Sequence, residues 1–419
     1  MSIVRPLTGV RYNLEEVLLK NVIAPPYDVI SPEMKEKLKA KCPHNVVTMD
    51  LPDGDVETKY AGAAKIYKEL LDKEILMKDK KPGFYVYEQI YEFGGKEYVR
   101  TGFVGLLKLE ELGKGSVYPH EKTLSGPKKD RFELMKECKT NFSQIFGLYL
   151  DQENMLNSVF TDAKKNMPSS SAVDDEGVKN TIWAVSGDEP VSFIEDFMKG
   201  KAIYIADGHH RYETALNFRD YMREQKGDVP GEEKPYDYVM MMFVNFYDEG
   251  LKIFPTHRVC EVDSSFSIDG FLDKVGKNFD LETLADEEAA LEYVNDPATG
   301  RTLAAYFDGK FYGLKANDET IENLHPVYRK IDTYLLQKAV MIDVLGMTEE
   351  QILRKEGVYF VQTMEKIEHL TSDKKAIAFI LKGVDIDIVR EISESGLVMP
   401  QKSTYFYPKL QTGLVINQL

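Results

Sequence analysis

Residues 201–216 read KAIYIADGHHRYETAL, and our expectations about the whole chain start from this stretch. A short run of apolar, strand-forming residues leads into Asp207 and Gly208, after which apolar residues recur at helical spacing. A strand, a tight glycine turn and a helix N-terminus together point several backbone N–H groups at one spot. Anions bind at such a spot because the helix dipole assists. Gly208 would let a ligand approach the backbone closely, and Arg211 could hold phosphate oxygens with both arms of its guanidinium.

The same residues allow two other interpretations. Asp207 could serve only as the N-cap of the helix, with the two histidines as ordinary polar residues of its first turn. A metal ion could bind through Asp207, His209 or His210. Adjacent histidines point about 100° apart on a helix, however, which makes them a poor joint pair of ligands. Residue spacing alone leaves these alternatives open.

Around this stretch the chain mixes strand-like and helical segments. Phe84–Phe93 and Tyr98–Leu109 flank Gly94-Gly95, which predicts a β-hairpin. Tyr238–Val244 is apolar throughout, which is typical of a strand in the centre of a sheet. Beyond about Val262, helical and strand-like segments alternate again. We therefore expect a mixed fold of the α/β or α+β class.

The length leaves room for two or three domains, since 419 residues are available at about 150 per domain. A polar run from Pro168 is followed by an acidic patch from Asp174, so residues 166–178 are a candidate joint. We place the main boundary at 261/262. It separates an N-terminal α/β part (1–261), which contains the glycine turn, from a C-terminal α/β part (262–419). In the C-terminal part, Tyr328–Val344 is predicted to be one helix.

The charge balance disfavours several kinds of partner. Fifty-three basic and 69 acidic residues give a net charge of −16, which repels nucleic acid but leaves room for a local basic pocket. The N-terminal MSIVRPLTGV lacks the apolar core of a signal peptide, and no apolar run approaches the roughly 20 residues of a membrane helix. Three cysteines far apart predict neither a disulfide framework nor a CxxC zinc site. We expect a cytoplasmic protein with no membrane partner.

Five motifs occur in order along the chain: APPYDVIS (24–31), YPHEKTLSGPKKDR (118–131), IADGHHRYETAL (205–216), FPTHRV (254–259) and STYFYPKLQTGLV (403–415). Together they resemble domain-of-unknown-function family 1015, a widespread bacterial and archaeal family whose members are often labelled ParB-like. The resemblance covers essentially the whole chain, but the name of the family supplies no activity.

Asp207–Arg211 also looks like the Asp-Gly-His-x-Arg turn of archaeal free-serine kinases, and it is similar to the phosphate motifs of sulfiredoxin and of ParB nucleotide-binding domains. The resemblance implies a ParB/sulfiredoxin-like nucleotide-binding core with an additional α/β region. It implies that Gly208, His209 and Arg211, with His210 beside them, contact the phosphates of ATP or ADP. Asp207 would assist Mg²⁺ or the acceptor hydroxyl.

The chain departs from each of these families in one respect. The serine kinases use an upstream glutamate as general base, and no glutamate of this chain aligns with it securely. Sulfiredoxin chemistry needs a cysteine in the turn, where this chain has His209. A partition protein needs a helix-turn-helix and a basic surface, which the net charge of −16 disfavours.

Two further segments carry candidate site residues. Lys122, Lys128, Lys129 and Arg131 form a local basic cluster that is either a solvated helix face or a means of neutralising polyphosphate. Glu121, just before this cluster, is a candidate general base. Asp28 lies in a loop stiffened by two prolines, which could line a pocket. The alternative is that Ser31 simply caps a helix that begins at Pro32.

Two more motifs have open interpretations. His257 and Arg258 follow an apolar strand, close to where α/β folds place ligand-binding groups, but a surface loop explains them equally well. Residues 402–409 mix hydroxyls, lysines and aromatic rings. They could close over a ligand or form a strand packed on the core.

We expect a Mg²⁺-dependent phosphotransferase that acts on a small hydroxylated metabolite such as free L-serine. The protein could form a homodimer. Asp207, His209, Glu121 and Asp28 are its candidate catalytic residues. The alternative is a nucleotide-gated binding module without turnover. A DNA-partition factor is the weakest of the three hypotheses because of the acidic charge.

Overall fold

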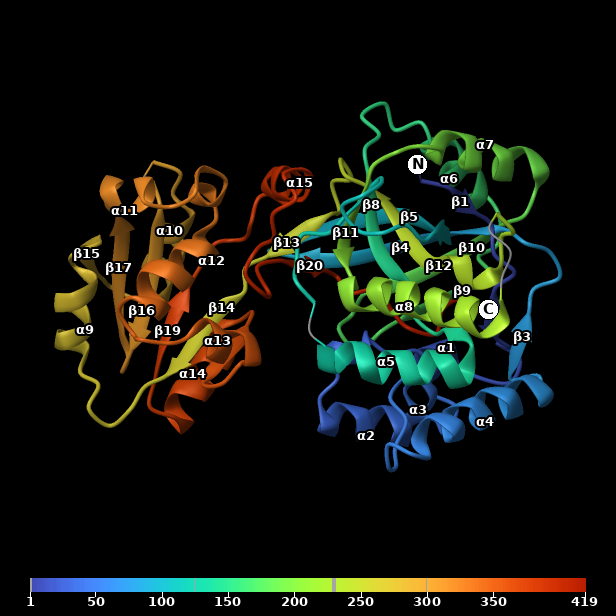
Figure 1. Cartoon of the computed structure of the whole chain (residues 1–419), viewed down its shortest axis with the longest axis horizontal. Helices are drawn as coiled ribbons and strands as arrows, with labels where there is room; N and C mark the ends of the chain where they lie inside the picture. The colour runs from blue at the N-terminus through green and yellow to red at the C-terminus, as the bar shows by residue number, and fades with distance from the viewer. Residues whose placement is uncertain (1, 124, 228–230, 299) are drawn as a thin grey trace. The chain divides into compact units, whose positions relative to one another are not determined.

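The computed structural model describes residues 2–123, 125–227, 231–298 and 300–419, and the chain divides into two compact units (Figure 1). The first unit consists of Met1–Pro119, Thr123–Lys252 and Pro408–Leu419. The second unit consists of His120–Lys122 and Ile253–Tyr407. The two units are therefore both built from discontinuous stretches of sequence.

The observed division differs from the expected one, first because residues 120–122 belong to the second unit. It comes at 252/253, where we expected 261/262, and it returns residues 408–419 to the first unit. Residues 166–178 do not separate the units. They contain β9 (Ser170–Val173), which pairs with β10 (Lys179–Val185) inside the first unit. The serine-rich run looked like a linker, but its Ser171 forms a hydrogen bond across this strand pair, with 2.9 Å between Ser171 Oγ and Thr181 Oγ1.

The first unit is organised around a mixed sheet. Among its described residues nine strands pair in the order β6-β11-β8-β12-β5-β4-β10-β9, with β1 on β5. The bounds not yet given are β1 (Val4–Arg5), β4 (Phe84–Phe93), β5 (Lys96–Lys108), β6 (Val117–Tyr118), β8 (Ile145–Tyr149), β11 (Ile203–Asp207) and β12 (Tyr238–Asn245). β11 runs parallel to β6 and β12 parallel to β8, whereas the other neighbours are antiparallel. The mixed α/β class is as predicted.

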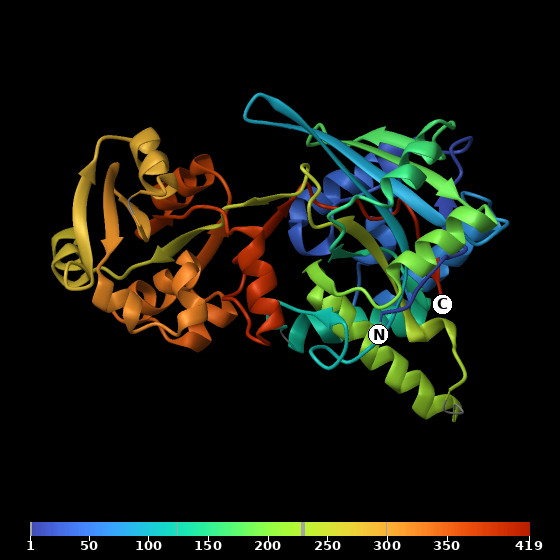
Figure 2. The ribbon, with the colours of Figure 1, turned by 90° about the horizontal axis from the view of Figure 1, so that it is seen from above.

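Two sequence predictions about this sheet are confirmed. Gly94 and Gly95 both have positive φ, 58° and 73°, and they turn the long β4–β5 hairpin that Figure 2 shows from above. β12 lies inside the sheet, between β8 and β5, and all of its residues are buried. A strand buried on both faces must be apolar on both faces, which explains the unbroken run Tyr238–Val244.

Helices and short strands cover this sheet. The helices are α1 (Leu19–Val22), α2 (Pro32–Lys41), α3 (Val47–Asp50), α4 (Lys59–Asp72), α5 (Ser125–Cys138), α6 (Asn157–Lys164), α7 (Asp188–Met198) and α8 (His209–Lys226). In Figure 1, α5 lies alongside α8, with α4 beyond it. The short strands are β2 (Val10–Tyr12), β3 (Leu76–Lys78), β7 (Thr140–Asn141) and β21 (Asn417–Gln418). The core joins Phe103 and Phe243 of the sheet to Tyr212 of α8.

The second unit is an antiparallel sheet with helices. Its described strands pair in the order β15-β17-β16-β19-β14-β18, and every pair is antiparallel. The strands are β14 (His257–Glu261), β15 (Phe279–Leu284), β16 (Thr302–Phe307), β17 (Lys310–Ala316), β18 (Val358–Val361) and β19 (Ala376–Ile380), with β13 (Lys252–Phe254) and β20 (Tyr405–Tyr407) paired separately. The helices are α9 (Ile268–Val275), α10 (Glu287–Asn295), α11 (Asp318–Glu322), α12 (Asp332–Leu335), α13 (Glu349–Arg354), α14 (Met364–Asp373) and α15 (Ile386–Glu394).

One predicted helix of the second unit has a different form. Tyr328–Val344 is not a single α-helix, because a 3₁₀ turn (Pro326–Lys330) precedes α12 and a π-helix (Leu336–Ile342) follows it. A π-helix bonds each N–H to the carbonyl five residues earlier, and such segments occur frequently at functional sites. Within the described ranges, no helix has both the length and the apolar character needed to cross a lipid bilayer.

Two glycines provide a matched test of the packing. In β5, a Cβ on Gly102 would lie 2.2 Å from the Phe243 carbonyl oxygen, whereas a Cβ on Gly62 of α4 would meet nothing within 4 Å. We expect Gly102→Ala to lower the free energy of unfolding by about 1–3 kcal/mol through overpacking. Gly62→Ala should raise it by up to about 1 kcal/mol through helix propensity. Trp183, the only tryptophan, is buried in the first unit, so its fluorescence during denaturant unfolding measures both changes. Equal effects of the two variants would contradict this packing.

Candidate functional site

The predicted strand, glycine turn and helix are present. β11 ends at Asp207, Gly208 has φ 97° and ψ 27°, and α8 begins at His209. The interpretation of Asp207 as the N-cap is wrong, because Gly208 holds that position and has no side chain to cap the helix. A Cβ on Gly208 would lie 2.9–3.1 Å from the Arg211 guanidinium. The missing side chain therefore makes room for Arg211 to fold back over the turn.

Asp207 lies between two cations. Its Oδ2 is 2.8 Å from Nη2 of Arg211, and its Oδ1 is 3.0 Å from Nζ of Lys409. Arg211 Nη1 also donates to the Gln144 carbonyl at 2.6 Å and to the Ser143 hydroxyl at 3.2 Å. These three side chains are withdrawn from water, with exposed fractions of 21% for Asp207, 11% for Arg211 and 12% for Lys409. Together they carry one net positive charge at the N-terminus of a helix.

Lys409 is the site residue that sequence reasoning missed. It belongs to the C-terminal segment, where Gln89 Nε2 donates to its carbonyl at 3.1 Å and Arg100 Nη2 to the Pro408 carbonyl at 2.5 Å. The Thr412 amide donates to the Ala24 carbonyl at 2.7 Å. The only signal in the sequence was the mixture of lysines and hydroxyls at 402–409, because no spacing rule links Lys409 to a residue 202 positions earlier.

Arg131 is engaged within the protein. Its Nη1 lies 3.0 Å from the Asp50 carboxylate, its Nη2 lies 2.6 Å from the Asp130 carboxylate, and its guanidinium packs over the Tyr27 ring at 4.4 Å. Only 6% of the residue is exposed. Two carboxylates compensate its charge, so this geometry makes it an anchor between α5 and the loop 24–31 and gives no support to a phosphate contact.

Asp28 belongs to the same electrostatic neighbourhood as Arg211. Burial raises the pKa of Tyr27 to about 12, with Asp28 raising it further, whereas Arg211 and Arg131 act in the opposite direction. Burial also raises the pKa of the Asp50 carboxyl, against the charges of Arg131 and Arg211. Tyr27 packs against Arg131, and Arg131 and Arg211 line the same small cavity, so the loop of Asp28 and the first turn of α8 lie in one region of the first unit.

A small cavity lies beside this neighbourhood. Its volume is about 40 Å³, and Arg131, Ser143, Arg211 and Thr214 are among the residues that line it. Thr214 is fully buried, and its hydroxyl has no hydrogen-bond partner among the described residues. The cavity is large enough for about one water molecule.

The remaining candidates divide between the two units. His209 is buried and His210 half-buried in the first turn of α8. Lys128 of α5 pairs at 2.7 Å with Glu213 of α8, which lies two residues beyond Arg211. Glu121 belongs to the second unit, through a backbone bridge to Met399, so its position relative to Asp207 is not determined.

The residues do not fit a resident metal ion. In the part of the chain that the structure describes, no group of three or more His, Cys, Asp and Glu side chains is placed to hold one. Both carboxylate oxygens of Asp207 are already in ion pairs with Arg211 and Lys409. No step of the chemistry below is therefore assigned to Mg²⁺.

Asp130 makes the stability of this region depend on pH. Burial opposes ionisation, but the charge of Arg131 and hydrogen bonds from Lys59, Arg131 and Tyr60 lower the pKa of Asp130 from 3.8 to about 2. A carboxyl with a lowered pKa stabilises the folded state above its unfolded pKa and loses this contribution as the pH falls through the folded value. We expect Asp130→Asn to flatten the loss of stability between about pH 4 and 2, measured by Trp183 fluorescence. Asp72→Asn, at the exposed end of α4, is the control, and an equal effect there would contradict the assignment.

Comparisons with solved structures show only distant likeness. A free serine kinase variant in complex with ADP has 11% identity over 70% of this chain and 84% of that chain, with a TM-score of 0.36. A conserved hypothetical protein from Pyrococcus furiosus has 13% identity over 70% and 89%, with a TM-score of 0.34. SbnI with a C-terminal truncation, from Staphylococcus aureus, has 8% identity over 71% and 82%, with a TM-score of 0.35. Likeness at this level supports no statement about activity.

No curated protein matches the chain. Its sequence does match one family, over residues 4–334, which include four of the five motifs described above. The match spans most of the chain and agrees with the resemblance that those motifs predicted. The chain therefore belongs to the family described as Protein of unknown function (DUF1015).

Proposed function

We propose that the first unit binds the phosphate groups of a nucleotide at the N-terminus of α8. The observation that carries this proposal is the position of Asp207 between Arg211 and Lys409, beside the glycine turn at the N-terminus of α8. The first N–H groups of a helix have no acceptor within the helix. A phosphate group would accept from these N–H groups and from both cations.

The charge of the site favours a small phosphorylated ligand over nucleic acid. Arg211 and Lys409 exceed Asp207 by one positive charge, and Asp28 in the neighbouring loop adds one negative charge, whereas the whole chain carries −16. A small ligand senses mainly the local charge, but a long polyanion would also meet the acidic remainder of the surface. The DNA-partition hypothesis is therefore the weakest on this charge distribution too.

The chemistry that we propose is transfer of a phosphoryl group from ATP or ADP to a small hydroxylated metabolite such as free L-serine. Enzymes of this kind contribute mainly positioning and charge neutralisation, which the pair Arg211 and Lys409 could supply. Asp28 is the candidate general base, because it lies in the same unit and the same electrostatic neighbourhood as Arg211. Asp207 would orient the acceptor hydroxyl once phosphate oxygens had replaced it on the two cations. The alternative is a nucleotide-gated binding module without turnover.

The binding step predicts a loss confined to the site. ATP or ADP at about 100 times its dissociation constant should stabilise the first unit by about 2.7 kcal/mol. Arg211→Ala should abolish this stabilisation and Lys409→Ala should weaken it. Each variant removes one of the two cations beside Asp207 that would bind the phosphate group. Thermal unfolding followed by Trp183 fluorescence measures the stabilisation in the unit that contains the site.

Arg219→Ala is the matched control. Arg219 lies on α8 two turns beyond Arg211 and pairs with Asp220, away from the glycine turn. It should retain the full nucleotide shift relative to its own unliganded baseline. A shift that Arg211→Ala leaves intact, or that Arg219→Ala removes equally, would place the nucleotide elsewhere.

The transfer step predicts a separate loss. Incubation with ATP or ADP, Mg²⁺ and L-serine should yield phosphoserine, detected by mass spectrometry. We expect Asp28→Asn to lower turnover by about 10²–10⁴-fold while nucleotide stabilisation persists, as for loss of a general base. Asp55→Asn, an exposed carboxylate of the same unit, is the control. Nucleotide stabilisation without phosphoserine would reject serine as the acceptor, and the same result across other small hydroxylated metabolites would favour the module without turnover.

A further inference from the structure

The second unit contains a cavity that the proposed function does not use. Its volume is about 480 Å³, within the range of about 300–1,000 Å³ that small-molecule sites occupy. Residues of the π-helix (Leu336–Ile342), of α13 and of the segment 398–401 line it, together with Lys122. Every lining residue belongs to the second unit.

One wall of this cavity is aromatic. The rings of Tyr328 and Tyr334 stack with centroids 4.1 Å apart and planes 14° apart. The Tyr328 hydroxyl donates to the Val398 carbonyl at 2.9 Å, which fixes the orientation of the stacked pair. Ile352 and Met399 add apolar surface beside the rings. A planar, apolar ligand group would find a rigid face to stack on here.

Two lysines and two glutamates line the cavity, and Arg354, which lies outside the lining but pairs with one of the glutamates, gives the charged groups an excess of one positive charge. Lys338 lies 2.6 Å from Glu349, and its hydrogen bond and charge, followed by the charge of Lys122, lower the pKa of that carboxyl. Glu350 is paired with Arg354 at 2.7 Å. Because Arg354 compensates Glu350, Glu349 is the one lining carboxylate left for Lys122 and Lys338 to compensate.

The wall formed by residues 398–404 is held from several sides. The Met399 amide donates to the His120 carbonyl at 2.8 Å, and His120 Nε2 lies 2.9 Å from Thr404 Oγ1. Nη2 of the buried Arg258 donates to the carbonyls of Gln401, at 3.2 Å, and Lys402, at 3.0 Å. The sequence motifs around His120 and Arg258 thus meet at this wall. A wall that is fixed before binding reduces the conformational entropy that the protein loses when a ligand binds.

We propose that this cavity binds a small aromatic monocarboxylate, with its ring against the tyrosine pair and its carboxylate at Lys122 and Lys338. A monoanion matches the single excess positive charge. A phosphate monoester carries about −1.5 to −2 at neutral pH and would leave negative charge uncompensated. The π-helix presents Gln337 and Lys338 to the cavity, in keeping with the frequent occurrence of such segments at functional sites.

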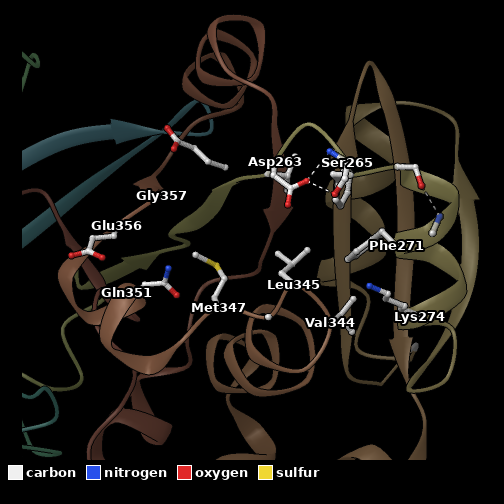
Figure 3. Close-up of a pocket in the computed structure, with 16 residues that line it drawn as sticks. Asp263, Ser265, Phe271, Lys274, Val344, Leu345, Met347, Gln351, Glu356 and Gly357 are labelled. Carbon is white, nitrogen blue, oxygen red and sulfur yellow. Dashed lines mark hydrogen bonds between the residues drawn. The ribbon is translucent and has the colours of Figure 1, made fainter.

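A second cavity of the same unit provides an internal control. It has a volume of about 660 Å³, and its lining includes the carboxylates of Glu261, Asp263 and Glu356 but one lysine, Lys274. Figure 3 shows Glu356 and Lys274 on opposite sides of this cavity, with Met347 and Leu345 between them. Its excess of carboxylates disfavours an anion, so a lysine variant there should not affect the proposed ligand.

The test uses the full chain and probes that lack phosphate. Indole-3-acetate and benzoate should bind the wild type in isothermal titration calorimetry, and saturation-transfer NMR should show contact with their rings. The neutral analogues indole-3-ethanol and benzyl alcohol should bind more weakly. Lys122→Gln and Lys338→Gln should each lower the affinity for the two carboxylates by about tenfold and leave the affinity for the neutral analogues unchanged. Lys274→Gln should leave all four probes unchanged.

Other results would overturn the proposal. These are no binding of either carboxylate at millimolar concentration, equal affinity in the wild type and both cavity variants, or a loss in Lys274→Gln. Tyr334→Leu should also lower the affinity for both aromatic carboxylates. If this variant does not fold, Lys122→Gln still tests the proposal, because Lys122 is exposed. The probes and these variants do not involve Arg211 or Lys409, so failure here is distinct from failure of the nucleotide proposal.

Discussion

The ion pairs of Asp207 join the β11–α8 turn to the C-terminal segment, 202 positions later in the sequence. Asp207 is the last residue of β11, Arg211 belongs to the first turn of α8, and Lys409 belongs to the C-terminal segment. A carboxylate largely withdrawn from water destabilises a fold unless cations and hydrogen bonds compensate it. Gly208 favours this compensation, because a Cβ there would lie 2.9–3.1 Å from the Arg211 guanidinium and crowd it.

The C-terminal segment is held by a second buried charge. Arg100 is fully buried, and its guanidinium donates to the Gln89 carboxamide and to the Pro408 carbonyl. Since a buried guanidinium without acceptors is costly, the backbone of the segment is part of what makes Arg100 tolerable in the core. The first unit is therefore incomplete until residues 408–419 are in place. The second unit, apart from residues 120–122, lies in sequence between β12 and this last segment.

Local patterns in the sequence predicted local structure well. The turn at Asp207-Gly208, the hairpin at Gly94-Gly95 and the helix cap at Ser31, whose side chain accepts from the Met34 amide, each depend on a few adjacent residues. The mixed fold class follows from the same patterns. The π-helix was missed because its apolar residues resemble those of an α-helix, and only the hydrogen-bond register distinguishes the two.

The composition of the site was harder to predict because its partners are distant in sequence. Lys409 contacts a residue 202 positions away, and Arg131 contacts Asp50 across 81 positions. The basic cluster 122–131 appeared as one candidate group, but the structure divides it. Lys122 belongs to the second unit, Lys128 pairs with Glu213, and Arg131 is neutralised by two carboxylates. The sequence shows how many charges the cluster contains. Only the fold shows which of them another side chain compensates.

The pairing at Asp207 has a consequence for the proposed chemistry. While Arg211 and Lys409 each hold one of its oxygens, Asp207 has fewer acceptor sites left to orient an acceptor hydroxyl. Phosphate oxygens that took over the two cations would release the carboxylate beside the phosphate group, where an acceptor must lie for in-line transfer. Binding of the nucleotide and release of the carboxylate toward the acceptor would then be one event. The ion pairs that stabilise the turn are thus the same contacts that the proposed reaction must exchange.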